Sequence, residues 1–332
     1  MIKHQKGMSL AELMIAMALG LMLTLGIATL FTQTRQSFNQ DEQIATMQAN
    51  LRFAIEVVVA DATMAGFWGG VLEPISIEND STLSIANDCG VGAADWAYDL
   101  STPINGVDNA TAAAAAAAFD CIDADEFRAT TDVLAIKRVR GLAIEDNPNQ
   151  CVHDFNATDT LVDNTVYLAD NGITGLLFAH PASGAIAVGG CVENREYAPT
   201  VHYIRNFSTD EDDGIPTLCR KVMVMGVTPT MTTECLVEGI EQLQIEYGVD
   251  ANSDGLPERY LSAPTAAQWP TVTAIRIHLL ARSLRPEQGY LNPKAYVLGN
   301  TTVTPADNFY RRSATTTVLL RNPANLRNLG RN

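Results

Sequence analysis

A run of apolar residues close to the N-terminus constrains this chain more than any other feature of its sequence. Residues 8–31 contain a single charged side chain, Glu12, and they follow a short leader that carries Lys3 and Lys6 and ends in Gly7. The run is longer than the roughly 20 helical residues that cross the hydrocarbon core of a bilayer. A carboxylate at the centre of a bilayer costs about 2.5–3.5 kcal/mol. A chain that keeps Glu12 there is therefore expected to use it.

The charges that flank the run predict its orientation. Lys3 and Lys6 precede it, and Arg35 is the only basic residue soon after it. The positive-inside bias then places the N-terminus in the cytoplasm and the rest of the chain outside. A secretory signal is the alternative, but it needs a shorter apolar stretch followed by a small-x-small cleavage site. Residues 32–35 offer no such site.

Gly7, Met8 and Glu12 resemble the class III leader of type IV prepilins. In that family the chain is cut after the glycine, the new N-terminal residue is methylated, and a glutamate stands fifth after the cut. Met8 departs from the pattern, because the family usually has phenylalanine there. The resemblance implies that residues 1–7 are a leader removed by prepilin peptidase. An uncleaved signal anchor with an incidental glutamate is the alternative.

Glu12 is predicted to act in assembly. Cleavage would give Met8 a free amine, and Glu12 of one subunit could neutralise the amine of a neighbour. Such a pair is strong in low dielectric only when both charges find partners. An unpaired Glu12 carboxylate would therefore favour the transfer of the subunit from the membrane into a filament.

Beyond Arg35 the apolar residues form a stripe, which predicts that the helix continues. Its members recur at spacings of three and four, the pattern of one helical face, and they are Ile44, Met47, Leu51, Ile55, Val58, Ala62 and Ala65. We expect residues 8–31 to form a transmembrane or filament-core helix and residues 32–66 its amphipathic extension, with Gly66 as the C′ residue.

Two segments in this extension resemble the PilW family of minor pilins, which shows an N-x-R-F-A segment and then a D-x-x-M-A-G-aromatic segment. The matching residues are Asn50, Arg52, Phe53, Ala54, Asp61, Met64, Ala65, Gly66 and Phe67. Residues 247–255, 272–283 and 311–322 resemble later parts of the family. Gly70 stands where many members have cysteine, so the family's disulfide pairings do not carry over.

The resemblance implies a minor pilin that waits in the bacterial inner membrane, with its head in the periplasm, and then joins the pilus. Its partners would be prepilin peptidase, other minor pilins, the major pilin, the inner-membrane assembly platform and a tip adhesin. The implied role is to prime type IV pilus assembly, at the tip. Two alternatives stay open: a J-like minor pseudopilin of type II secretion, and a membrane-anchored periplasmic adhesin.

The composition of residues 67–332 predicts a folded, strand-rich head. Charged residues make up 18% of the chain and apolar residues 47%, and there is room for one large or two ordinary domains. Short β-branched or aromatic segments indicate strands, at residues 133–139, 165–169, 200–205, 221–226, 240–247, 272–281 and 315–320. We expect an α+β, pilin-like fold in which a mainly antiparallel sheet with loop insertions packs on the lower helix. The seven-alanine tract at residues 112–118 predicts a helical turn or two, or a flexible insert.

The charge and the motifs limit the function. A formal charge of −16 argues against nucleic acid as a partner of the head, because phosphate contacts need a basic face. The sequence has no G-x-S-x-G, no H-E-x-x-H and no phosphate-binding glycine loop. We therefore expect no catalytic residue and no required cofactor.

Six cysteines indicate disulfides rather than metal binding. None forms a C-x-x-C pair, and an exported head lies in an oxidising compartment. Six cysteines allow 15 pairings. Cys219 with Cys235 is the pair expected first, because it closes a short loop.

One loop suggests calcium. Asp250, Asn252 and Asp254 offer oxygen ligands at alternate positions, Gly255 follows, and Glu258 could complete the shell. The twelfth position of the loop is Leu261 rather than glutamate, which excludes an EF-hand proper. A hairpin with ordinary Asp, Asn and Gly turn chemistry is the alternative.

Overall fold

The computed structural model describes residues 7, 9–90, 96–144, 161–181, 192–226 and 228–324. Its first element is a long helix, α1 (Leu10–Thr63). The chain divides into two compact units, residues 1–46 and residues 47–332. The expected head boundary lies at residue 67, whereas the second unit begins at Met47. The last part of α1 therefore belongs to the head.

In the first unit, α1 is an apolar helix whose side chains are largely exposed. By length and composition it could cross a membrane, and its most apolar stretch is not buried inside the structure. The hydroxyls of Thr24, Thr29, Thr32 and Thr34 donate to backbone carbonyls three or four residues earlier. These bonds satisfy the polar groups that such a surface would otherwise present to lipid.

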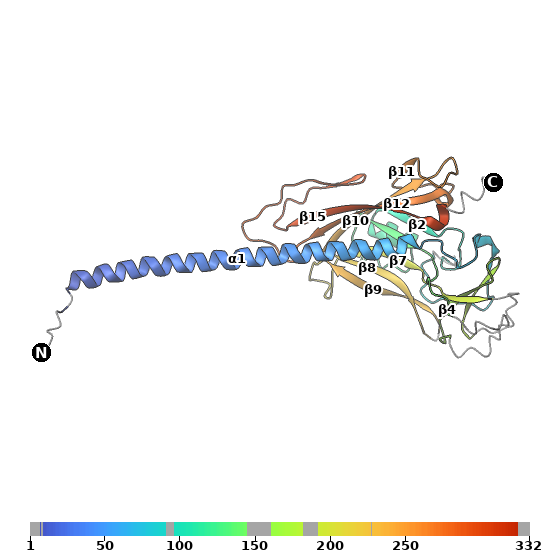
Figure 1. The fold of residues 1–332 in the computed structure, drawn as a ribbon, viewed down its shortest axis with the longest axis horizontal. Coiled ribbons are helices and arrows are strands. Elements are labelled where there is room, and N and C mark those ends of the chain that lie inside the picture. Colours follow the sequence, from blue (N-terminus) through green and yellow to red (C-terminus); the bar gives the residue numbers. More distant parts are fainter. Residues whose placement is uncertain are drawn as a thin grey trace. The chain divides into compact units, whose positions relative to one another are not determined.

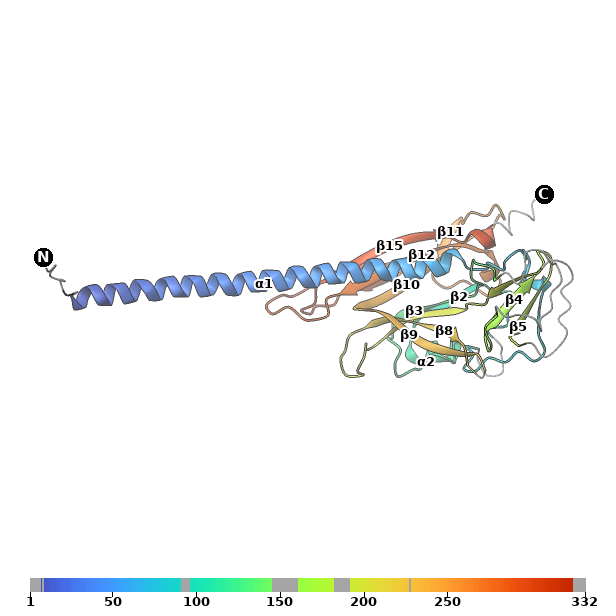
Figure 2. The same ribbon diagram turned by 60° about the horizontal axis from the view of Figure 1, so that its bottom comes forward.

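In the second unit, one stripe of α1 is buried in the head. Met47, Leu51, Ala54, Val58 and Ala62 are at most 5% exposed, and they share one hydrophobic core with apolar residues of strands from two sheets. Figures 1 and 2 both show this part of α1 with β12 and β15 on one side and β8 and β9 on the other. The stripe predicted from the sequence is thus the face on which the head is built.

The head contains fifteen strands among the described residues, arranged in four sheets. One sheet has the order β11-β10-β12-β15 and another the order β2-β3-β7-β8-β9, while the smaller ones are β1-β5-β4-β6 and β13-β14. The strands are β1 (Ile77–Asn79), β2 (Ile104–Ala110), β3 (Thr131–Ile136), β4 (Val166–Asp170), β5 (Gly175–Ala179), β6 (Glu193–Glu196), β7 (Thr200–Arg205), β8 (Thr217–Val224), β9 (Thr230–Glu238), β10 (Ile240–Val249), β11 (Arg259–Leu261), β12 (Val272–Arg282), β13 (Tyr296–Leu298), β14 (Thr301–Val303) and β15 (Arg311–Leu319).

The α+β class and the mainly antiparallel pairing are confirmed, with β1 and β5 as a parallel pair. The single sheet expected from the sequence is wrong, because the strands divide between two cores. Every residue of β3 is buried. Leu134 and Ile136 belong to the core around α1, whereas Val133 and Ala135 belong to a second core. A strand whose two faces are both apolar needs a layer on each side, and a helix with one sheet supplies only one of them.

Two shorter features complete the part of the fold that matters here. The alanine tract forms α2 (Ala112–Ala118), and the Thr111 hydroxyl caps it by accepting the N–H of Ala114. Single 3₁₀ turns lie at η1 (Pro74–Ser76) and η2 (Trp269–Thr271). After Thr63, α1 ends in a tight turn, and Gly66 has a φ of 68°. The positive φ of Gly66 turns the chain away from the helix as predicted, and its N–H donates to the carbonyl of Lys137 at 3.0 Å rather than to a carbonyl of α1.

Candidate functional site

The predicted processing site lies at the start of α1. Gly7 is exposed, and Met8 lies outside the described residues. The Ser9 N–H donates to Glu12 Oε2 at 2.9 Å, and the Glu12 N–H donates to Ser9 Oγ at 3.3 Å. This reciprocal pair is a capping box, in which each side chain satisfies a backbone N–H that the helix cannot.

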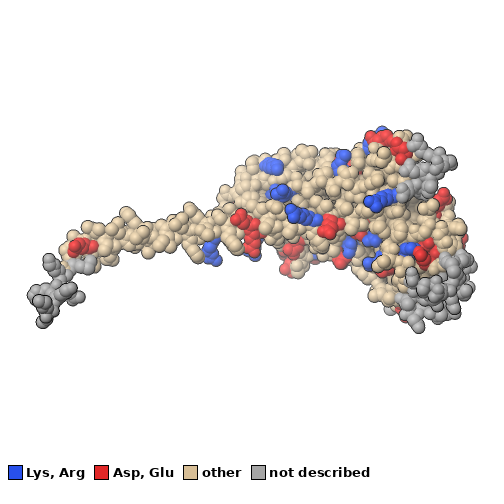
Figure 3. Space-filling model, viewed as in Figure 1, with Lys and Arg blue, Asp and Glu red and all other residues tan. Residues whose placement is uncertain are grey.

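The capping box was not predicted from the sequence, although the S-x-x-E pattern at residues 9–12 is typical of one. It fixes the Glu12 carboxylate beside the backbone of Ser9, one residue from the predicted cut. Figure 3 shows an acidic patch near the N-terminal end of the first unit, within a stretch in which residues 8–34 carry no other charged side chain. The sequence identifies it as Glu12, because no other acidic residue occurs in residues 1–40.

A second cluster fixes the end of α1 to the head. Asp61 is 3% exposed and receives three cationic or imidazole groups: Arg138 Nη2 at 2.6 Å, His202 Nε2 at 3.0 Å and Arg220 Nη1 at 3.1 Å. Arg138 lies just after β3, His202 lies on β7 and Arg220 on β8. Asp61 therefore connects the helix to three neighbouring parts of the five-stranded sheet.

The environment of Asp61 keeps it ionised. Burial raises the pKa of its carboxyl, but the hydrogen bond and charge of His202 and the contacts with Arg138 outweigh burial and hold the pKa well below its ordinary value. A buried charge is tolerated when it is paired and hydrogen-bonded. Asp61 stands on the apolar stripe of the helix, and a carboxylate in that position is the signal from which this anchor could have been predicted.

Two amide side chains extend the connection between helix and sheets. Asn50 Nδ2 donates to the carbonyl of Glu238 at 3.0 Å, where β9 turns into β10. Asn322 Nδ2 donates to the carbonyl of Ala65 at 3.1 Å, so the end of the described chain closes on the end of α1. Asn50, Asp61 and Gly66, which stand in the PilW-like segments, thus all serve to attach the helix to the head.

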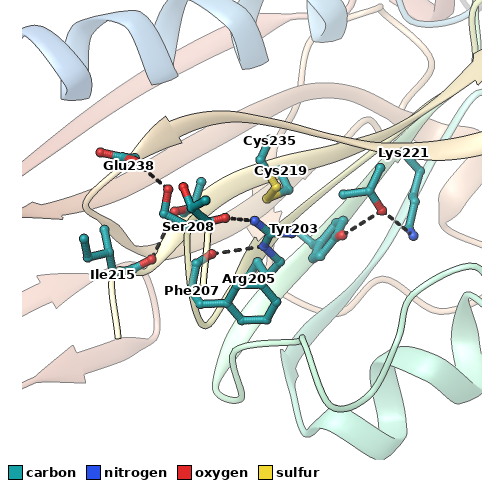
Figure 4. Close-up of a disulfide and its surroundings, with 12 residues drawn as sticks. Tyr203, Arg205, Phe207, Ser208, Ile215, Cys219, Lys221, Cys235 and Glu238 are labelled. Carbon is teal, nitrogen blue, oxygen red and sulfur yellow. Dashed lines mark hydrogen bonds between the residues drawn. A yellow bond between two sulfur atoms is a disulfide. The ribbon is translucent and has the colours of Figure 1, made fainter. Parts of the chain in front are cut away.

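Cys219 and Cys235, the pair expected first, form a disulfide. They stand directly opposite each other on β8 and β9, as Figure 4 shows. Beside them Lys221 Nζ donates to Thr233 Oγ1 at 2.7 Å, and the Ser208 hydroxyl donates to Glu238 Oε1 at 2.5 Å. A second disulfide joins Cys89 and Cys121. Cys151 and Cys191 lie outside the described residues.

The loop after β10 brings the predicted calcium ligands together. One carboxylate oxygen from each of Asp250, Asp254 and Glu258 lies within 4.8 Å of the others. Asp250 is buried and accepts the N–H of Ser253 at 2.6 Å and of Gly255 at 2.9 Å. Asn252 Oδ1 accepts the N–H of Asp254 at 2.9 Å. These bonds account for the turn by itself, and calcium at this loop stays a prediction.

Comparison with known proteins agrees with this geometry. The family described as "Type IV Pilus-assembly protein W" (PilW) matches residues 201–322, a range that holds β7–β15, the Cys219–Cys235 disulfide and the Asp250 loop. The family described as "Prokaryotic N-terminal methylation motif" matches residues 2–28, which contain Gly7, Met8 and the Ser9–Glu12 capping box. The two matches together support a PilW-type pilin.

Comparison with solved structures and with curated proteins gives weaker similarity. Among solved structures, a type IV-like pilin from Thermus thermophilus is similar, with 15% sequence identity and a TM-score of 0.24 over 49% of this chain and 86% of that one. No curated protein matches the sequence. The PilW match begins at residue 201, so the two PilW-like segments in α1 lie outside it. The structure nevertheless joins Asp61 directly to His202 and Arg220, which lie inside it.

Proposed function

We propose that this PilW-type pilin is a minor pilin that primes assembly of the type IV pilus and takes a place at the pilus tip. The methylation motif implies processing by prepilin peptidase and contact with other pilus components. The observation that carries the proposal is Glu12, the single acidic residue of the apolar run at residues 8–31, whose carboxylate accepts the N–H of Ser9, the second residue after the predicted cut.

The chemistry of Glu12 supports a role in subunit addition. In the uncut chain its carboxylate caps its own helix through Ser9. Cleavage after Gly7 would place a new ammonium group on Met8, next to Ser9. Opposite charges attract strongly where water is scarce, so a Glu12 carboxylate would favour a site beside the ammonium group of a neighbouring subunit.

The size of the head supports a place at the tip. Residues 47–332 form one compact unit with two hydrophobic cores. A subunit that repeats along a shaft must fit beside many identical copies. A head with several sheets is easier to accommodate at the end of a filament, where it has neighbours on one side.

Variants at Glu12 test this proposal. In cells that otherwise lack the chain, Glu12→Ala should leave the protein in the membrane fraction and reduce both the number of pili and twitching. Glu42→Ala is the matched control, because Glu42 is an exposed carboxylate on the same helix outside the apolar run. Its pili should equal those of the wild type.

The outcomes distinguish the alternatives. The role of Glu12 is refuted if Glu12→Ala enters sheared pili at the wild-type level. Loss of protein secretion with normal pili would favour the pseudopilin alternative. Normal pili and secretion in a strain without the chain would favour the anchored adhesin.

A further inference from the structure

The head has a groove that is separate from Glu12, from the Asp61 cluster and from the Asp250 loop. It lies just past the end of α1 and has a volume of about 700 Å³, within the size range of binding pockets. Its lining comes from five places in the sequence: residues 66–76, 101–104, 172–173, 269–272 and 322–323. All of them belong to the second unit, so the groove is a feature of the head alone.

The lining is apolar and rich in aromatic and proline side chains. Trp68, Trp269, Pro103, Pro270 and Pro323 contribute to the wall. Such a surface recognises apolar groups, and the few polar groups in it set their orientation. Among the described residues, Glu73 is the only charged one in the lining, and it is exposed.

Large apolar side chains project from the groove toward solvent. Leu72 is 62% exposed, Ile75 is 90% exposed and Ile173 is 77% exposed, and all three belong to the lining. Exposed aliphatic side chains clustered around a groove are typical of interaction sites. A small molecule inside the groove would leave such projecting side chains uncovered, whereas a protein surface would cover them.

The charge around one rim indicates the chemistry of the partner. No lysine or arginine occurs between Arg52 and Arg128, and this stretch supplies the lining at residues 66–76 and 101–104. Two basic side chains reach it from elsewhere, and both are paired: Arg195 with Asp170 and Glu193, and Lys137 with the carbonyl of Asp99. The stretch carries Glu73 and, shortly after, the exposed Glu78. The nearest basic residue to the lining in sequence is the exposed Arg321, beside Asn322 at a different part of the wall.

From these observations we infer that the groove binds an apolar segment of another protein that carries lysine or arginine at the end facing Glu73. The apolar residues of that segment cover Leu72, Ile75 and Ile173, and its basic end meets the acidic rim. Such complementarity chiefly determines specificity and the rate of association. This inference goes beyond the proposed function, because the groove binds such a segment whether or not the chain primes a pilus.

A binding measurement on the full-length chain in nanodiscs tests the inference. The probes are a capped octapeptide of leucine, proline and glycine that ends in two arginines, and the same peptide ending in two glutamates. Tryptophan fluorescence reports binding, since Trp68 and Trp269 line the groove. We expect the arginine peptide to bind at least about tenfold more tightly than the glutamate peptide, and Glu73→Gln to narrow that difference.

Three variants localise the effect. Ile75→Asp and Ile173→Asp should each weaken binding of the arginine peptide by about tenfold or more. Leu142→Asp is the control, because Leu142 is 86% exposed and does not line the groove, and it should bind like the wild type. Equal binding of both peptides, or wild-type binding by Ile75→Asp and Ile173→Asp, would overturn the inference.

Two further results would overturn the assignment of the occupant. A dimer of the chain that Ile75→Asp dissociates would show that a second copy fills the groove. Tighter peptide binding after deletion of residues 325–332 would show that the chain's own tail competes for it. Neither result affects the Glu12 experiment, so the inference about the groove can be refuted while the proposed function stands, and the reverse.

Discussion

Asp61 Oδ2 lies 3.0 Å from His202 Nε2, and this buried contact joins the helix to the centre of the five-stranded sheet across 141 residues of sequence. Arg138 and Arg220 complete the cluster. The cluster attaches the last turns of α1 to the five-stranded sheet within the second unit.

Asp61→Asn should destabilise the head by about 3 kcal/mol at neutral pH, because it leaves buried cationic groups without their counter-charge. The folded-state pKa of Asp61 is depressed, so its stabilisation is present above the unfolded pKa and is lost as pH falls through the folded value. Denaturant unfolding of the full-length chain measures the effect. Glu56→Gln, on the exposed face of the same helix, should change stability little; an equal loss in both variants would refute the anchor.

Asp132 should make the free energy of unfolding depend on pH in the opposite direction to Asp61. It is 1% exposed and accepts the N–H groups of Asn109 and Ile245 at 2.8 and 2.6 Å. Burial raises its pKa from 3.8 to about 7. Because the pKa is raised in the folded state, the protonated carboxyl stabilises the fold fully below the unfolded-state pKa. This stabilisation is lost as the pH rises toward 7, and the loss is at most about 4 kcal/mol.

Asp132→Asn should therefore remove part of the decline in unfolding free energy between pH 4 and pH 7. The substitution also replaces one acceptor oxygen, so the variant is less stable at low pH, and the slope rather than the absolute value is the test. Denaturant unfolding at several pH values gives that slope. An unchanged slope would show that Asp132 does not titrate in this range.

The Cys219–Cys235 disulfide should stabilise the head. A bridge that closes a loop of this length is worth about 3 kcal/mol in the chain-entropy account. The double variant Cys219→Ala, Cys235→Ala should unfold at a lower denaturant concentration than the wild type. Non-reducing peptide mapping should recover the two cysteines in one linked peptide; recovery of Cys219 linked to any other cysteine would contradict the pairing.

Calcium should raise the melting temperature of the chain if the Asp250 loop binds it. Glu258→Gln should abolish that increase with little effect in the absence of calcium, because the Glu258 side chain is exposed. Asp250→Asn should destabilise the chain even without calcium, since Asp250 accepts two backbone N–H groups of the turn. A melting temperature that calcium leaves unchanged would show that the Asp250 loop does not bind calcium.

Local pattern was enough to predict part of the fold. The apolar run, the stripe that follows it and Gly66 predicted α1, and the β-branched segment at residues 200–205 coincides with β7. β2 was not predicted, because its sequence, Ile-Asn-Gly-Val-Asp-Asn-Ala, is rich in the Asn, Asp and Gly residues that are typical of turns. Its Gly106 is required by packing instead, since a Cβ there would lie 2.2 Å from Tyr247 Oη and from the Val133 carbonyl.

The candidate functional residues also fall into those that local sequence predicts and those that it does not. Glu12 and the Asp250 loop are local patterns, and the sequence reveals both. The partners of Asp61 are separated from it by 77, 141 and 159 residues, and the groove combines five distant segments. Contacts of this kind depend on how strands pair across the chain, which periodicity within a single segment does not determine.

Mass spectrometry of the N-terminal peptide of the chain, purified from its native membranes, shows whether the leader is removed and the new amine exists. We predict that the mature chain begins at Met8 with a methylated amine, and that Glu12→Ala is cut at the same bond although it fails to assemble. A functional protein in which Gly7 and Met8 are still joined would contradict this prediction, because the ammonium group that Glu12 needs would never form.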